Sequence, residues 1–123
     1  MDEIRISATE DTPAVLLNDQ EGLFKISGRS LPEDAFWFYN PIIEWLSNYS
    51  KTPLAKTEFS FNLEYFNTAS AKQVFKIANI LSAISKTQTV KVKWYYDDGD
   101  KDMCASGERF SKLCNLPFEL IKN

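Results

Sequence analysis

The residues best placed to do chemistry lie between Leu63 and Lys72, where an apolar stretch is followed by asparagine, threonine and serine. We expect Thr68 and Ser70 to present hydroxyl groups at the N-terminus of a helix. The first N–H groups of a helix lack intrahelical partners and its dipole is positive at that end, so a phosphate on either hydroxyl would be stabilised. The simpler interpretation is that Asn67 or Thr68 only caps the helix, which contributes about 1 kcal/mol.

The second candidate is the acidic run from Asp97 to Asp102. It lacks the spacing and the downstream bidentate glutamate of an EF-hand loop. We interpret it as a solvated turn that caps the last helix, because aspartate is favourable near a helix N-terminus. If the strand before it is parallel to the strand before Thr68, both segments lie at the same edge of the sheet. Asp97 and Asp98 would then join a partner surface there.

Several chemistries are excluded by composition. The chain has no histidine, which removes Ser-His-Asp and Cys-His catalysis and imidazole metal ligands. Cys104 and Cys114 lack zinc-site or redox spacing and are interpreted as reduced thiols. Cys104 is expected to be a small structural side chain, because the acidic residues near it would not make its thiol reactive. We expect no metal, no cofactor and no enzymatic activity.

Length and charge limit the class of protein further. A chain of 123 residues with 44% hydrophobic residues fits one globular domain, residues 1–123. The formal net charge of −3 argues against nucleic-acid binding as the main function. The acidic N-terminus lacks an apolar run, so we expect no secretory signal, no membrane contact and a cytoplasmic location.

The elements on either side of Thr68 have the clearest patterns. Thr57 to Phe66 and Thr89 to Tyr96 alternate between apolar and polar residues, which predicts two strands with one wet face each. Between them, Thr68 to Lys86 has apolar residues at helical spacing. This order predicts a right-handed crossover between parallel strands, with the helix on the apolar face. On the wet face, we expect Lys91 and Lys93 near Glu58 and Glu64.

Upstream, two short apolar segments, Pro13 to Leu17 and Leu23 to Ser27, are predicted to form a hairpin. Ser30 followed by Glu33 has the form of a capping box, so we expect a helix to begin with Ser30 as its N-cap. Pro41 predicts a kink or a division into two short helices. The tryptophans are expected in the core rather than in a ligand site. They are Trp37, Trp45 and Trp94.

The C-terminal part is predicted to hold a helix from Asp102 to Leu113 and a short strand or docked tail from Leu116 to Ile121. Together the elements predict an α+β two-layer domain, with a mixed sheet of four to five strands and helices on one face.

Three segments resemble the SiaC family of bacterial regulatory phosphoproteins: residues 28–49, 61–77 and 92–113. The most specific motifs are LEYFNTASAK, which begins at Leu63, and WYYDD, which begins at Trp94. The resemblance implies a STAS-like fold and a partner switch. In such a switch a serine/threonine kinase phosphorylates a threonine and a metal-dependent phosphatase removes the phosphate. The unmodified form binds and activates a diguanylate cyclase, which links the protein to cyclic di-GMP signalling and biofilm formation or aggregation.

The threonine of the family falls on Thr68. Many members have a small hydroxyl residue where this chain has Ala69, which leaves Ser70 as the second candidate for phosphorylation. The partner surface implied by the resemblance and by the sheet edge comprises Asn67, Ser70, Lys72, Arg29, Ser30, Asp97 and Asp98.

Two alternatives remain open from the sequence. A STAS-like module could hold a small ligand or an anion at the same helix N-terminus without covalent modification. A small enzyme could use Asp97, Asp98 or Asp102, although the chain offers no companion base.

Overall fold

The computed structural model describes all residues from 1 to 123. The chain forms six strands and three helices. In chain order they are β1 (Ile4–Ile6), β2 (Ala14–Asn18), β3 (Leu23–Ser30), α1 (Ala35–Tyr49), β4 (Lys56–Phe66), α2 (Thr68–Ile84), β5 (Thr89–Tyr96), α3 (Lys101–Leu113) and β6 (Phe118–Lys122).

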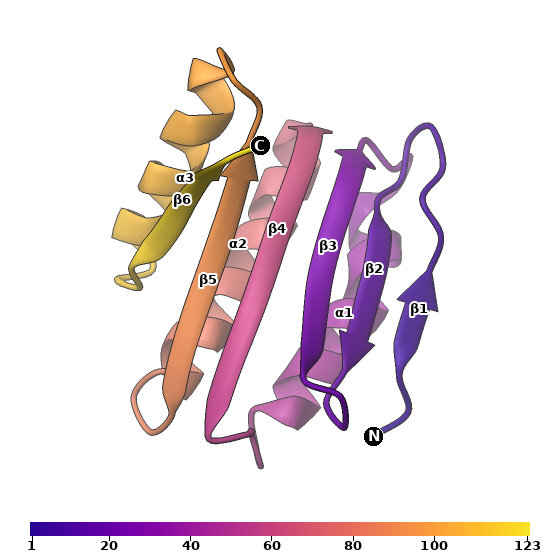
Figure 1. Ribbon diagram of the computed structural model, residues 1–123. Helices are drawn as coiled ribbons and strands as arrows, with labels where there is room; N and C mark the ends of the chain where they lie inside the picture. The colour runs from indigo at the N-terminus through magenta and orange to yellow at the C-terminus, as the bar shows by residue number, and fades with distance from the viewer.

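All strands belong to one mixed sheet, whose spatial order β1-β2-β3-β4-β5-β6 is the order of the chain (Figure 1). The first three strands pair antiparallel, and each later neighbouring pair is parallel and connected through a helix. The hairpin and the parallel β4–β5 pair are therefore confirmed. The sheet has six strands rather than the expected four to five, because β1 is a three-residue edge strand with no clear sequence pattern.

The α+β two-layer arrangement is confirmed, with all three helices on one face of the sheet. Alternation along β4 explains the layering, because Phe59, Phe61 and Leu63 are buried beneath the helices. Glu58 and Glu64 point to the opposite, open face, where both form ion pairs. A one-sided apolar surface can be covered by a single helical layer, and the polar side remains in water.

On the open face, the ion pairs differ in part from the expected ones. Lys93 Nζ lies 2.6 Å from Glu58 Oε1, as expected, and its hydrogen bond lowers the pKa of Glu58. Lys91 lies beside Glu58 in the β4–β5 register, as expected, but its ion pair is with Glu119 of β6 at 3.1 Å. Glu64 pairs with Arg29 at 3.6 Å. Exposed pairs of this kind contribute little to stability.

The predicted N-cap of α1 is wrong. Ser30 is the last residue of β3, pairs with Phe66 of β4 and is fully buried. The helix begins at Ala35, and Asp34 caps it by accepting a hydrogen bond from Trp37 N–H at 3.0 Å. The hydroxyl of Ser30 bonds to Tyr39 and Ser70, and the helix starts only at Ala35, so the hydroxyl does not cap α1 and the local capping-box pattern does not take effect.

Helix α1 continues past Pro41 as one element, so the predicted division into two helices is wrong. Proline removes a backbone donor and crowds the carbonyl one turn earlier. Pro41 lies on the exposed side of α1, whereas Tyr39, Ile42 and Leu46 are fully buried on the other side. Packing of the buried side holds the helix together across the missing hydrogen bond.

No helix in the structure is both long enough and apolar enough to cross a membrane.

Candidate functional site

The candidate site lies at the edge of the sheet where β3, β4 and β5 end. These strands are parallel, so their carboxyl ends meet at the same edge (Figure 1). Arg29 at the end of β3, Thr68 after β4 and the loop at Asp97 after β5 therefore share this edge, as expected from the sequence.

The junction between β4 and α2 leaves the Thr68 hydroxyl free. Asn67 is the N-cap, and its Oδ1 accepts a hydrogen bond from Ser70 N–H at 2.8 Å. The first backbone bond of the helix runs from Ala71 N–H to Asn67 O at 2.9 Å. The N–H groups of Thr68 and Ala69 therefore have no partner within the protein. Thr68 is exposed, and its hydroxyl makes no hydrogen bond within the chain.

Ser70 has a different environment, because it is fully buried. Its hydroxyl donates to Ser30 O at 3.0 Å and accepts from Ser30 Oγ at 2.8 Å. Since the proton of Ser30 Oγ is used there, Tyr39 must donate in the 2.6 Å contact between its hydroxyl and Ser30 Oγ. Burial raises the pKa of Tyr39 to about 12, so it keeps the proton that it donates.

This hydroxyl network changes the interpretation of two candidates. Ser30 and Ser70 have no exposed surface, so they join β3, α1 and α2 in the interior instead of lying on a partner surface. Among the two candidate hydroxyls, only that of Thr68 is accessible to another protein.

The acidic loop after β5 is a capping turn. Asp100 is the N-cap of α3 and accepts from Met103 N–H at 3.0 Å. Asp97 and Asp98 are exposed and contact the C-terminal residues. Asp97 Oδ1 accepts from Asn123 Nδ2 at 2.8 Å, and Asp98 lies 3.9 Å from Lys122 Nζ.

Adding Ca²⁺ or Mg²⁺ to the protein should leave its Tm within about 1 °C, because the acidic side chains already serve as a cap and as contacts to the C-terminus. No three carboxylate or thiolate side chains of the chain are grouped to hold a metal ion. Thermal melts at increasing ion concentration measure this directly. A stabilisation of several degrees at micromolar ion would contradict the interpretation of the loop.

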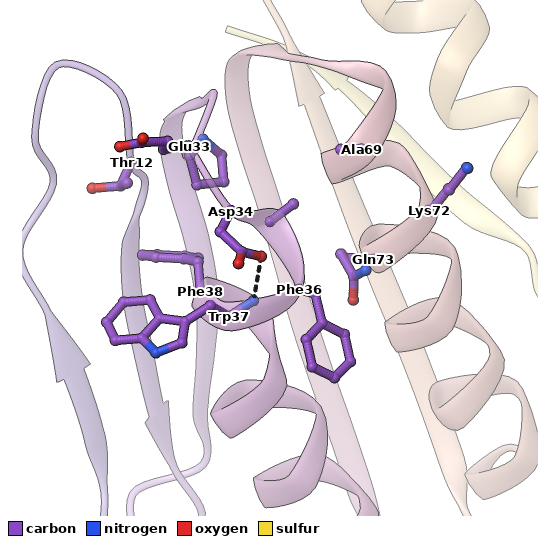
Figure 2. A pocket seen from close by; sticks show the side chains of 11 residues that line it. Thr12, Glu33, Asp34, Phe36, Trp37, Phe38, Ala69, Lys72 and Gln73 are labelled. Carbon is purple, nitrogen blue, oxygen red and sulfur yellow. Dashed lines mark hydrogen bonds between the residues drawn. The ribbon is translucent and has the colours of Figure 1, made fainter.

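A groove between the first turns of α1 and α2 was not predicted (Figure 2). Its volume is about 740 Å³, and Phe36, Trp37, Lys72 and Gln73 are among the residues that line it. Trp45 and Trp94 are buried as expected, but Trp37 is 76% exposed, so its assignment to the core is wrong.

Helical geometry explains why Trp37 is exposed. The buried side of α1 follows Tyr39, Ile42 and Leu46, whereas Trp37 shares a face with Pro41 and Glu44, both exposed. The position of Trp37 in the helical pattern, rather than its residue type, would have revealed the groove.

Both cysteines are free thiols, as expected. Cys114 is buried, and burial raises the pKa of its thiol.

An accessible hydroxyl beside an apolar groove suits a protein that is modified and bound by other proteins. Comparison with known proteins defines the class as a regulatory phosphoprotein, because residues 6–123 match the model of the family described as "SiaC family regulatory phosphoprotein". The chain therefore belongs to the SiaC family.

Relatives and solved structures agree with this assignment. A protein of Pseudomonas aeruginosa strain UCBPP-PA14 is 27% identical over 121 residues, which cover 98% of this chain and 96% of the relative. The crystal structure of apo-SiaC from P. aeruginosa matches with a TM-score of 0.88 and 27% identity, over 98% of this chain and 99% of that one. A third match is SiaC in the crystal structure of the diguanylate cyclase SiaD in complex with its activator SiaC, from the same organism. Its TM-score is 0.89 and its identity 26%, over 98% of this chain and 99% of that one.

Proposed function

We propose that this protein is a phosphorylation-controlled activator of a diguanylate cyclase. In this proposal the unmodified protein binds the cyclase, a serine/threonine kinase transfers a phosphate to Thr68, and a metal-dependent phosphatase removes it. The protein itself acts by binding rather than by catalysis. Family membership and the likeness to SiaC in complex with SiaD support the choice of partner.

One observation carries the choice of Thr68: its hydroxyl is exposed and unbonded at the first residue of α2. A kinase must reach this oxygen without unfolding the chain, and here nothing covers it. The free N–H groups of Thr68 and Ala69 and the positive end of the α2 dipole then stabilise the phosphate. Modification is therefore compatible with the folded state.

The phosphate controls binding through charge and hydration. It adds about −1.5 to −2 charges at pH 7. An unmodified threonine can be enclosed in a dry interface, whereas a phosphate there must lose its water or find a cation. A penalty of about 3 kcal/mol would weaken the complex more than a hundredfold.

A binding measurement with defined modified forms tests the proposal. Phosphothreonine can be incorporated at position 68 and, as a matched control, at Thr52, an exposed threonine that follows the C-terminal end of α1. Calorimetry with the SiaD-like cyclase of the same organism should show binding of the unmodified and Thr52-modified proteins. The Thr68-modified protein should bind about a hundredfold more weakly. Equal affinities of all three forms would contradict the proposal.

A further inference from the structure

We propose that the groove between the first turns of α1 and α2 receives an acidic segment of the cyclase, and that its carboxylate and the phosphate on Thr68 compete for Lys72. This inference rests on the proposed function. It specifies where the partner binds and how the modification interferes.

The groove offers an apolar surface of a size suited to protein contacts. The side chain of Phe36 is 60% exposed and that of Trp37 is 76% exposed. Beside the main cavity, a second hollow of about 450 Å³ is lined by the same two aromatic residues together with Ile6, Phe38 and Pro41. The two hollows share Phe36 and Trp37, so the apolar surface continues from one to the other along the outer side of α1. Exposed aromatic residues gathered in this way are typical of a binding surface.

The wall of the groove also contains a polar atom without a partner. Gln73 lies in the second turn of α2, lines the groove and is only 7% exposed. Its Oε1 is buried and has no hydrogen-bond partner within the protein. Buried polar side-chain atoms nearly always have a partner, so this acceptor points to a donor supplied by a bound segment.

Lys72 gives the α2 side of the groove a cation that a carboxylate on that segment can pair with. Helix α2 contains Lys72 and Lys76 but no acidic residue. Lys76 Nζ lies over the ring of Phe36, 5.8 Å from its centroid, whereas Lys72 is exposed and makes no ion pair or hydrogen bond. Glu33 and Asp34 line the opposite side, at the start of α1. A carboxylate entering the groove is repelled from α1 and attracted to Lys72.

The spacing of Thr68 and Lys72 gives the phosphate access to the same cation. Residues four apart on a helix are neighbours on one face, with Cβ atoms about 5 to 6 Å apart. A phosphate on Thr68 can therefore pair with Lys72 and also repel the acidic segment. Both effects weaken binding of the partner in the groove.

Two pairs of variants test the groove by calorimetry with the SiaD-like cyclase and the unmodified protein. Lys72→Gln should weaken binding about fivefold. The control, Lys25→Gln, removes an exposed lysine on the open face and should have no effect.

Trp37→Ala should weaken binding tenfold or more. Its control, Leu113→Ala, truncates a residue of α3 that is 62% exposed and should leave binding unchanged. Affinities of Lys72→Gln and Trp37→Ala that equal those of their controls would overturn the inference.

A measurement without the cyclase separates this inference from the proposed function. In the protein with phosphothreonine at position 68, ³¹P NMR reports the second pKa of the phosphate, ordinarily about 6. Pairing with Lys72 favours the dianion, so Lys72→Gln should raise this pKa by about 0.2 to 0.4, while Lys25→Gln should not. An unchanged pKa would overturn the pairing. If the wild-type protein does not bind the cyclase, the proposed function is wrong, and the ³¹P titration alone decides the pairing.

Discussion

Replacing Thr68 with alanine should abolish phosphorylation by the cognate kinase and leave the protein permanently in its partner-binding form. The reason is that Thr68 carries the accessible hydroxyl, while that of Ser70 is enclosed by hydrogen bonds with Ser30. A kinase assay with mass-spectrometric site mapping measures this. Thr68→Ser is the matched variant and should remain a substrate, because it keeps the hydroxyl.

The fold should tolerate these changes. Asn67, rather than Thr68, caps α2, so Thr68→Ala should change the free energy of unfolding by no more than about 0.5 kcal/mol. Thr68→Asp should weaken partner binding only partly, since one carboxylate has less charge and fewer acceptor oxygens than a phosphate. Phosphorylation of Thr68→Ala to the same extent as the wild-type protein would show that the modified residue lies elsewhere.

Gly107→Ala should lower the free energy of unfolding by about 1 to 3 kcal/mol. In an exposed helix this substitution ordinarily stabilises by about 1 kcal/mol. Here the added Cβ would overlap Trp94 Cδ1 and lie 2.8 Å from Trp94 Nε1. The indole is fully buried, and its Nε1 donates to Met103 O at 2.9 Å.

The surroundings of Trp94 prevent it from moving away. Four phenylalanine rings have centroids within 6.3 Å of it. They belong to Phe61, Phe66, Phe110 and Phe118. Denaturant unfolding measures the effect. As a control, Ala105→Gly at an exposed position of the same helix measures the difference in helix propensity between alanine and glycine without any change in packing. An increase in stability of Gly107→Ala would contradict the close contact with Trp94.

The elements that could be predicted are those with long, clean periodicity. The alternation from Thr57 to Phe66 and the helical spacing that follows depend only on burial of one side of each element. The periodicity of apolar residues within the segment itself indicates which side that is. The start of α1 could not be predicted in this way. Ser30 and Glu33 satisfy a local capping pattern, but the hydroxyl of Ser30 is bonded to Tyr39 and Ser70, which belong to α1 and α2.

In the candidate site, too, some features follow from the local sequence and others depend on residues of other elements. The free hydroxyl of Thr68 follows from its place between an apolar strand and a helix, which the sequence contains. Burial of Ser70 depends on its contacts with Ser30 and Tyr39, which come from other elements of the sheet and helix layer. The residue type of Trp37 suggests the core, but its position on α1 places it on the exposed side.

The agreement between strand order and chain order has a consequence for folding kinetics. Each strand pairs only with the strand before it and the strand after it in sequence. No pairing therefore requires closing a loop longer than one helical connection, which keeps the contact order low for a mixed sheet. During synthesis the sheet can grow by one strand at a time from the N-terminal hairpin, with α1 and α2 docking before β6 has left the ribosome.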